Sequence, residues 1–276
     1  SFVRTTDFRT RCSAIPTDSL PYTYGFEDAS GTGAAATFNS CFGRYTNSTT
    51  AYPYTSSTNK HSGSYALYCY STAAYYSYLT LPSFEDDISD LFISFWAYKT
   101  SANYGHVYVG VMSNPGDITT FDTLATLQVS AVSTWEFFEV PLSSYTGNGG
   151  VLTLLAPIGS AANYVYIDDI TVSMPPSCLR PTDITLDTNT LTATSASLNI
   201  VHDDASSFLV YWRKAGTTLW DTLEVSGTTI NLTGLTMGAP YEGEVYTLCG
   251  SDTSIGYTTF SFSAGCASIS ANDLPF

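Results

Sequence analysis

The sequence predicts an all-β protein built from two domains. Thr, Ser, Tyr, Val and Phe, most of which favour strands, are abundant, whereas the helix formers Lys, Glu, Gln and Met are scarce. No window of ten or more residues places apolar side chains at the i, i+3, i+4 and i+7 positions of a helix, whereas two-residue alternation recurs along the chain. At 276 residues the chain exceeds the usual length of one domain, roughly 100 to 200 residues, so we expect two.

The first domain is expected over residues 21–174. Eight segments within it are rich in strand-forming residues and are separated by Gly, Asn, Pro and Ser. These segments are residues 66–70, 76–81, 91–99, 106–112, 124–129, 135–142, 151–156 and 164–172. Eight or more strands in a domain of this size are typical of a two-sheet jelly-roll sandwich.

Two consecutive prolines mark the boundary between the domains. Pro175 and Pro176 follow a strand-like segment, and proline cannot donate a hydrogen bond to a strand ladder. The second domain is expected over residues 177–266, with some seven strand segments that include 197–200, 208–213, 229–232 and 241–248. This size and number of strands predict a seven-stranded sandwich.

The two ends of the chain carry the same residue pattern. Phe8, Cys12, Ile15, Leu20 and Pro21 correspond to Phe262, Cys266, Ile269, Leu274 and Pro275, each pair being offset by 254 positions. Such repetition indicates one period of a tandem array. We therefore expect residues 1–20 to hold the end of a preceding repeat and a linker, residues 267–276 to begin the next repeat, and the natural protein to be longer.

The charge balance excludes several classes of partner. Nine basic residues against 24 acidic residues give a net charge of −15, which repels nucleic-acid phosphates and anionic lipid headgroups. No apolar run approaches the roughly 20 residues that a membrane helix needs. Residues 1–11 lack the apolar block of a signal peptide, so we expect any export signal to have been removed. We expect a monomeric fragment with no nucleic-acid partner and no membrane insertion.

Catalytic motifs are missing from the sequence. It contains no G-x-S-x-G, H-E-x-x-H, phosphate-binding glycine loop or C-x-x-C motif, and its only histidines are His61, His106 and His202. A glycoside hydrolase would need two carboxylates across a cleft. The candidates for that role form one cluster in a predicted loop: Glu85, Asp86, Asp87 and Asp90. A solvated acidic turn is the preferred interpretation of this cluster, and we expect no enzymatic activity.

Six cysteines without metal-ligand spacing indicate disulfides and an oxidising compartment, so the protein is expected to be secreted or on the cell surface. Cys178 precedes the first strand of the predicted sandwich and Cys249 ends its sixth. Both therefore lie near one pole of the sandwich, and we expect them to be bonded.

The sequence repeat suggests the roles of the remaining cysteines. Cys12 and Cys266 should serve successive jelly rolls in the same way, which pairs Cys12 with Cys41 and leaves Cys266 without its partner in this chain. Cys69 shares strand parity with the apolar Leu67 and is expected to be a buried thiol. A bond between Cys41 and Cys69 would overturn this assignment.

Two consecutive strand segments predict an aromatic face for ligand binding. Alternation places Trp96 and Tyr98 on one side of the first segment and His106 and Tyr108 on one side of the second, so all four can share a face. Aromatic side chains stack on the apolar faces of sugars and a histidine beside them can bind hydroxyl groups, which predicts glycan recognition. The alternative is that a loop covers this face and the aromatics belong to the core. Less weight goes to a run of tyrosines, since tyrosine is ordinary on two-sided strands: Tyr65, Tyr68, Tyr70, Tyr75, Tyr76 and Tyr78.

A set of motifs spans the second domain. It consists of Pro181, the strand 196–200, Tyr211-Trp212-Arg213, Trp220, and Leu232-Thr233-Gly234-Leu235 followed by Tyr241 and Val245. On these motifs the domain resembles fibronectin type III domains over its whole length. The resemblance implies a tyrosine corner, in which the hydroxyl of Tyr241 bonds back to the chain near the leucine. Ile200 stands where the family usually has a core Trp, which changes the packing but not the fold.

A second set of motifs spans the first domain. They are Leu20-Pro21-Tyr22 leading to Phe26-Glu27, Cys41-Phe42, Ser62-Gly63-Ser64-Tyr65-Ala66-Leu67, Ile93-Ser94-Phe95-Trp96, residues 135–142, and Tyr166-Ile167-Asp168-Asp169-Ile170. Together they resemble the adhesin-type jelly rolls called choice-of-anchor or cleaved-adhesin domains, relatives of the MAM domain that recur in surface proteins and gingipain-type proteases of anaerobic bacteria. Cys-Trp is commoner in those domains than the Cys-Phe found here. The resemblance implies a bacterial, extracellular, non-catalytic module that often binds calcium.

A calcium site is expected between the first and last strands of the jelly roll. Asp168 and Asp169 interrupt an apolar strand, where uncompensated charge would be costly. Glu27 and Asp168 are the first choice of ligands, with Asp28 and Asp169 as alternates, because calcium collects oxygen atoms from separate segments. In the resembling families the turn that includes Ser62 often lends carbonyl oxygens to the same ion. The alternative is that Asp168 or Asp169 faces solvent or caps a turn.

The function expected from the sequence is that of a non-catalytic adhesin or carbohydrate-binding segment within a longer tandem-repeat surface protein. Its partners would be glycans or proteins of a host or cell surface, and repetition would increase the avidity of a weak site. The alternative is a purely structural stalk or spacer that accompanies an enzyme domain elsewhere in the parent chain.

Overall fold

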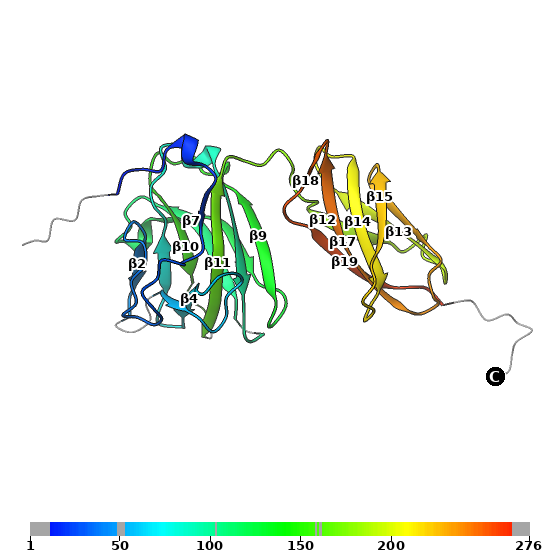
Figure 1. Ribbon diagram of the computed structural model, residues 1–276, viewed down its shortest axis with the longest axis horizontal. Coiled ribbons are helices and arrows are strands. Elements are labelled where there is room, and N and C mark those ends of the chain that lie inside the picture. Colours follow the sequence, from blue (N-terminus) through cyan, green and yellow to red (C-terminus); the bar gives the residue numbers. More distant parts are fainter. Residues whose placement is uncertain (1–11, 49–52, 103, 158, 160–161, 267–276) are drawn as a thin grey trace, which may run out of the picture. The chain divides into compact units, whose positions relative to one another are not determined.

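The computed structural model describes residues 12–48, 53–102, 104–157, 159 and 162–266 of the chain. The chain divides into two compact units, Ser1–Pro175 and Pro176–Phe276, and every sheet lies within one unit (Figure 1). The predicted all-β fold class is confirmed. Phe8 and positions 269–276, which carry part of the sequence repeat, lie outside the described residues, so the flanking repeats stay predictions. No helix among the described residues is long and apolar enough to cross a membrane.

The first unit is a sandwich of two antiparallel sheets. Its six-stranded sheet has the order β3-β4-β11-β6-β9, with β1 paired to one end of β11. The bounds are β1 Tyr22–Tyr24, β3 Tyr54–Ser56, β4 Ala66–Ser71, β6 Phe92–Tyr98, β9 Trp135–Pro141 and β11 Asn163–Ser173. Its five-stranded sheet has the order β2-β5-β10-β7-β8, with β2 Gly43–Thr46, β5 Ser77–Thr80, β7 His106–Met112, β8 Phe121–Gln128 and β10 Val151–Ala156. Three single turns of 3-10 helix complete the unit: η1 Thr17–Ser19, η2 Ile88–Asp90 and η3 Ile118–Thr120.

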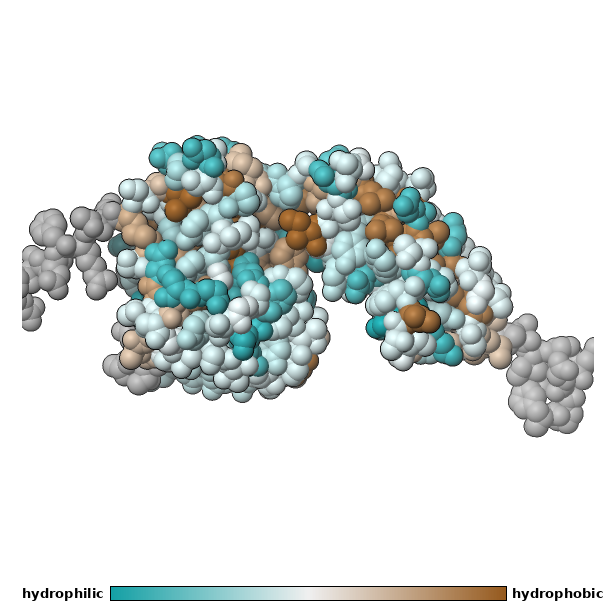
Figure 2. Space-filling model, viewed as in Figure 1, coloured by the Kyte–Doolittle hydropathy of each residue, from teal (hydrophilic) through white to brown (hydrophobic). Residues whose placement is uncertain are grey.

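The core of the first unit fills the space between these sheets. Alternate residues of each strand point into it, such as Phe95 of β6, Val109 of β7 and Leu154 of β10, and all three are fully buried. Full burial of one such side chain contributes about 1.5–3 kcal/mol. On the face drawn in Figure 2, hydrophobic residues form only small separate patches on each unit. This is expected because most of the apolar side chains are buried in the cores.

A β-bulge interrupts β11, which is labelled in Figure 1 and pairs with β4 on one side and β6 on the other. Val165 and Ile167 face the core before the bulge, and Ile170 and Val172 face it after the bulge. An extra residue is needed to turn odd positions and even positions to the same side of a sheet. The register shift between Asp168 and Thr171 supplies it, and Asp169 adopts a left-handed conformation there, with φ of 49°.

The second unit is a smaller sandwich with its own core. One sheet has the order β12-β13-β16, with β12 Asp183–Asp187, β13 Ser195–Val201 and β16 Thr229–Thr233. The other has the order β15-β14-β17-β18, with β19 also paired to β17; the bounds are β14 Ser207–Lys214, β15 Asp221–Ser226, β17 Pro240–Cys249, β18 Asp252–Thr253 and β19 Thr258–Ser263. The seven longer strands match the predicted sandwich, and β18 is a two-residue addition. Ile200 is buried in the core, at the position where a Trp is usual in the resembling family.

Both predicted disulfides are present. Cys12 is bonded to Cys41 and Cys178 to Cys249. The other two cysteines are free thiols in the described part of the chain, Cys69 buried and Cys266 exposed, as predicted. These bonds close one long loop in each unit and fit an oxidising environment.

The tyrosine corner predicted in the second unit is confirmed. The backbone N–H of Thr236, next to Leu235, donates a hydrogen bond of 2.8 Å to the hydroxyl of Tyr241, which is buried. The substitution Tyr241→Phe leaves that N–H without its acceptor. We expect it to lower the free energy of unfolding of this unit by about 1–2 kcal/mol, measured by urea denaturation. The control Tyr211→Phe removes a hydroxyl from the outer face of the same sheet and should change stability by less than about 0.5 kcal/mol. Equal losses for the two variants would contradict a role for the corner.

Candidate functional site

The most distinctive surface of the first unit is a row of aromatic side chains on the outer face of its six-stranded sheet. Five partly exposed rings stand opposite one another in register, one on each of five adjacent strands. In sheet order they are Tyr54 of β3, Tyr68 of β4, Tyr166 of β11, Tyr98 of β6 and Trp135 of β9. We call this row the aromatic ladder. Four strand intervals make it about 19 Å long.

Neighbouring rings of the ladder are in contact. Their centroids are 4.8 Å apart for Tyr54 and Tyr68, 4.9 Å for Tyr68 and Tyr166, 5.9 Å for Tyr166 and Tyr98, and 5.3 Å for Tyr98 and Trp135. Such cross-strand pairs stabilise a sheet by about 0.2–1 kcal/mol each. Because the rings remain partly exposed, the ladder is both a structural element and a surface available to a ligand.

Further aromatic pairs flank the ladder on the same face. On one side, Trp96 lies against Phe137 with 5.2 Å between ring centroids. On the other side, Tyr70 stacks on Tyr164 at 4.8 Å, and the edge of Tyr104 meets Tyr164 at 4.5 Å. The surface is therefore several side chains wide.

The structure corrects the predicted set of four ligand-binding residues. Trp96 and Tyr98 lie on this aromatic face, but His106 and Tyr108 belong to β7, which is in the other sheet. Since the two outer faces of a sandwich point in opposite directions, the four side chains do not form one site. β6 and β7 belong to different sheets and therefore do not form a hairpin. Tyr108 packs instead against a small cluster of Tyr78, Met112 and Leu155 and remains partly exposed.

The histidine beside the aromatic face is His61, which the sequence did not single out. Its ring stacks on Trp96 with 3.9 Å between centroids and an angle of 13°, and it also meets the edge of Trp135 at 5.6 Å. His61 Nδ1 is 2.7 Å from Asp169 Oδ2. Because a carboxylate can only accept, Nδ1 carries the proton and Nε2 points away from this contact.

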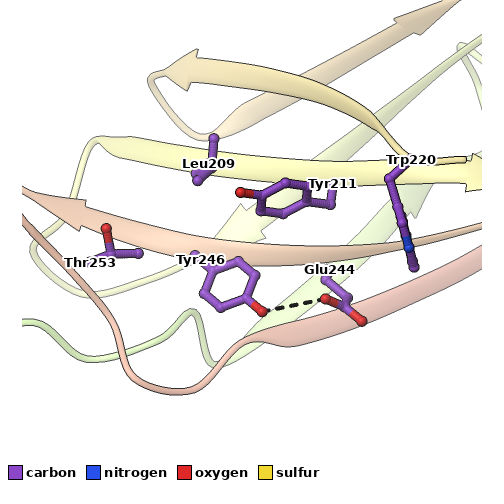
Figure 3. A pocket seen from close by; sticks show the side chains of 6 residues that line it. All are labelled: Leu209, Tyr211, Trp220, Glu244, Tyr246 and Thr253. Atoms are coloured by element: carbon purple, nitrogen blue, oxygen red, sulfur yellow. Dashed lines mark hydrogen bonds between the residues drawn. The ribbon is translucent and has the colours of Figure 1, made fainter.

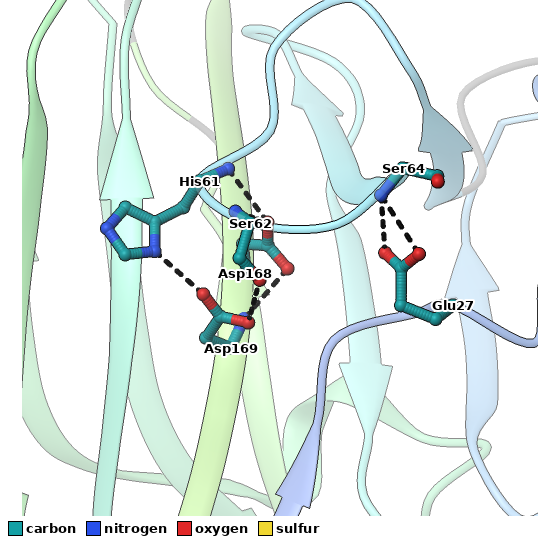
Figure 4. Close-up of polar contacts among 6 residues, drawn as sticks. All are labelled: Glu27, His61, Ser62, Ser64, Asp168 and Asp169. Carbon is teal, nitrogen blue, oxygen red and sulfur yellow. Dashed lines mark hydrogen bonds and ion pairs between the residues drawn. The ribbon is translucent and has the colours of Figure 1, made fainter.

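Two carboxylates hold the loop that carries His61 (Figure 4). Asp168, fully buried at the bulge of β11, accepts the backbone N–H groups of His61 at 2.8 Å and of Ser62 at 3.2 Å. Burial raises the pKa of Asp168 to about 6, while these N–H groups oppose that shift. Asp169 accepts a hydrogen bond of 2.7 Å from the hydroxyl of Ser62.

Glu27 holds the other end of the same loop. Its carboxylate accepts the backbone N–H groups of Ser64 at 2.9 Å and of Tyr65 at 3.1 Å (Figure 4). Gly63 directly precedes Ser64 and has a φ of 54°, and a Cβ atom there would clash with the carboxylate of Glu27. Only glycine fits this conformation and this close approach. Asp28 turns elsewhere and accepts a 2.5 Å hydrogen bond from the hydroxyl of Tyr24.

Three of the predicted calcium ligands have suitable chemistry and accept hydrogen bonds from the loop at 61–65. Glu27, Asp168 and Asp169 offer oxygen atoms, as calcium prefers. The loop turns its N–H groups toward Glu27 and Asp168, and Ser62 points its hydroxyl at Asp169. Within the described ranges, no group of three or more His, Cys, Asp or Glu side chains could hold a metal ion. Calcium binding therefore stays a prediction of the sequence.

The acidic cluster considered for glycoside hydrolysis lies around η2. Glu85, Asp87 and Asp90 are exposed, and Asp86 accepts a 2.9 Å hydrogen bond from the hydroxyl of Thr17. The exposure of three of the four carboxylates agrees with the preferred interpretation of a solvated acidic turn.

None of the protein-family models matches the sequence, and no curated protein matches it. Among solved structures, the chain is similar to the glycoside hydrolase domain of Endo-D from Streptococcus pneumoniae R6, with 16% identity, a TM-score of 0.38, and coverage of 87% of this chain and 43% of that one. It is also similar to a fibronectin type III domain of human collagen XX, with 17% identity, a TM-score of 0.28, and coverage of 33% of this chain and 95% of that one. At these values the likenesses carry no argument about function, and the fold class rests on the strands and sheets described above.

The buried Asp168 predicts a pH dependence of stability. Its pKa of about 6 exceeds the ordinary 3.8, so the folded protein retains a proton between pH 4 and 6 that the unfolded chain releases. This contribution is fully present below pH 4 and is lost as the pH rises through 6. We expect the free energy of unfolding in chelated buffer to fall by about 2–3 kcal/mol across that interval because of this group. Urea denaturation at several pH values should show that Asp168→Asn removes this part of the slope, whereas the exposed Asp90→Asn does not; an unchanged slope in Asp168→Asn would contradict the assignment.

Calcium binding can be tested at the same carboxylates. A calcium site at Glu27 and Asp168 requires that added calcium raise the unfolding temperature of the chelated protein by mass action, as measured by calorimetry. Glu27→Gln and Asp168→Asn should each abolish the rise, whereas Asp90→Asn should preserve it. Identical unfolding temperatures with calcium and with chelator would mean that these carboxylates only hold the loop and do not bind calcium.

Proposed function

We propose that the first unit is a non-catalytic carbohydrate-binding module of an extracellular protein, and that the second unit acts as its spacer. The observation that carries the proposal is the aromatic ladder, in which five partly exposed rings stand in register on adjacent strands. Most surface aromatics of a sheet occur singly, whereas a continuous exposed row of this kind is typical of a recognition surface.

The chemistry of the ladder suits sugars. Sugar rings present apolar faces edged by hydroxyl groups, and flat aromatic side chains cover those faces while polar neighbours bind the edges. At about 19 Å the ladder is long enough for several sugar rings, so an extended glycan is the expected ligand. His61 and Asp169 stand at its edge, beside Trp135 and Trp96, and supply groups for the hydroxyls.

The charge of the chain narrows the glycan class. A net charge of −15 disfavours sulfated or otherwise acidic polysaccharides, since like charges repel at long range. The aromatic rings themselves are uncharged, and His61 is already paired to Asp169. Neutral glycans are therefore the proposed class.

An extracellular setting is supported by the two disulfides. The resemblance to adhesin-type jelly rolls and the sequence repeat support a module that recurs along a surface protein. Linked weak sites in such an array would gain avidity. The competing proposal is a stalk, in which both units serve only to space other domains. A stalk does not need to bind a ligand, so binding experiments distinguish the stalk from the carbohydrate-binding module.

Glycan binding should depend on the rings of the ladder that lie nearest to His61. We expect Tyr98→Ala and Trp135→Ala each to weaken binding to neutral polysaccharides by about tenfold, because each removes a stacking surface worth about 1.4 kcal/mol. Glycan arrays would find a ligand for the full chain, and calorimetry would measure the affinity of each variant. The matched control is Tyr75→Ala, which removes an exposed tyrosine from a turn outside the ladder.

The outcomes separate three cases. Loss of binding in both ladder variants, with normal binding in Tyr75→Ala, supports the proposal. Binding that survives both ladder substitutions places the glycan site elsewhere and overturns it. A complete absence of glycan binding favours the stalk.

A further inference from the structure

A groove on the second unit has a chemistry different from that of the aromatic ladder. It lies on the outer face of the sheet β15-β14-β17, has a volume of about 480 Å³, and is drawn in Figure 3. Its lining residues are Leu209, Tyr211, Trp220, Glu244, Tyr246 and Thr253. In Figure 3, the rings of Tyr211 and Tyr246 lie between Thr253 at one end and Trp220 at the other, with Glu244 beside Trp220.

Strand parity builds this groove. On β14, Phe208 and Val210 are fully buried in the core, which turns Leu209 and Tyr211 to the outer face. The register then sets Tyr211 opposite Glu244 of β17. Tyr211 and Tyr246 meet edge to face, with 5.8 Å between centroids and an angle of 84°, so they form a corner of two aromatic walls.

The same sheet face already binds one cation in this manner. Two residues along β14, the guanidinium of Arg213 lies 4.0 Å from the ring centroid of Trp220. Its Nε donates a hydrogen bond of 2.7 Å to Glu242, which faces it across the strands. An aromatic face and a carboxylate together form a good site for a guanidinium group.

One step along the register, the groove again combines aromatic rings with a carboxylate, that of Glu244. Glu244 stands beside the aromatic walls, and the structure records no direct ion pair for it within residues 162–266. The hydrogen bond that it accepts from the hydroxyl of Tyr246 is long, at 3.4 Å. Burial raises the pKa of Glu244, which means that its charge is poorly compensated, although Arg213 nearby partly offsets the effect.

The surroundings favour a basic protein partner over a sugar. Residues 176–266 contain three basic residues against nine acidic ones, so the unit attracts positive charge. Leu219, next to Trp220 in the sequence, is 84% exposed, and Ile255, two residues after Thr253, is 79% exposed. Both apolar side chains are therefore accessible to a partner that lies along the groove. A second groove of about 360 Å³ adjoins the first and shares Trp220 and Glu244 with it, which gives room for an extended segment.

We propose that this groove binds an arginine side chain of an extended basic segment on a partner protein. The guanidinium would stack against Tyr211 and hydrogen-bond to Glu244, in the way that Arg213 stacks on Trp220 and donates to Glu242. Leu219 and Ile255 would contact apolar residues of the same segment. The inference is independent of glycan binding by the first unit.

The test uses the full chain and two synthetic peptides. The first is an acetylated, amidated hexapeptide of alternating Arg and Gly, and the second replaces each Arg by citrulline, which has the same shape without the charge. Binding is followed by calorimetry and by tryptophan fluorescence. We expect the arginine peptide to bind at least about tenfold more tightly than the citrulline peptide, because charge is needed for both contacts.

Variants of the groove separate specific binding from general attraction to an acidic protein. Glu244→Gln should weaken the arginine peptide by at least about fivefold, and Glu244→Lys should abolish binding. The matched control Asp183→Asn makes the same charge change on an exposed residue of the opposite sheet and should alter the affinity by less than about twofold.

Three results would show that the groove does not bind arginine. They are equal binding of the two peptides, equal affinities of Glu244→Gln and Asp183→Asn, or no binding of either peptide to a chain with native fluorescence and cooperative unfolding. A neutral glycan that displaces the arginine peptide and quenches the tryptophan fluorescence would assign the groove to sugars instead. The quenching must be lost in Trp220→Leu for the glycan to be placed in this groove.

Discussion

The bulge in β11 is the feature on which the recognition surface of the first unit depends. The apolar positions of this strand change from odd to even between Ile167 and Ile170, and only an extra residue lets both halves face one core. The extra residue lies at two consecutive aspartates. As a result, Asp168 is buried and Asp169 adopts a left-handed conformation. The buried charge then needs donors, and the loop at 61–65 supplies them. His61 is held against Trp96 as a result.

Alternation of side chains gives each sheet two uses. Inward positions are committed to the core, whose burial supplies most of the stability, while outward positions in contact with solvent are free to acquire another chemistry. In the first unit the free face carries the ladder from Tyr54 to Trp135. In the second unit it carries alternating charged and aromatic residues, with Arg213 and Glu242 in one row and Tyr211 and Glu244 in the next. The two surfaces therefore differ although the folding rule is the same.

Much of the fold follows from local patterns in the sequence, because strand parity and turn residues act over a few positions. The tyrosine corner at Tyr241 was implied by the family resemblance, whereas the Cys178–Cys249 bond followed from the poles of the predicted sandwich and the Cys12–Cys41 bond from the sequence repeat. Which sheet a strand joins is a longer-range property: β6 and β7 each have one apolar face, and that pattern is the same whether they pair with each other or cross between sheets. The predicted site that combined Trp96 with His106 is wrong because these residues lie in different sheets. His61 was missed because nothing local links a loop residue to a strand 107 positions later.

The parity change in β11 is visible in the sequence as Val165 and Ile167 followed by Ile170 and Val172, with two aspartates interrupting the apolar pattern between them. Carboxylates at such a place can be stabilised by a cation or by N–H groups, and both solutions need the same residues. The sequence does not distinguish them, since the choice depends on which way the peptide planes of the loop turn. In the structure, Gly63 with its positive φ allows Ser64 and Tyr65 to point their N–H groups at Glu27, so the backbone supplies the compensating dipoles. The positive φ of Gly63 therefore permits the arrangement in which backbone N–H groups of the loop bind the carboxylate of Glu27.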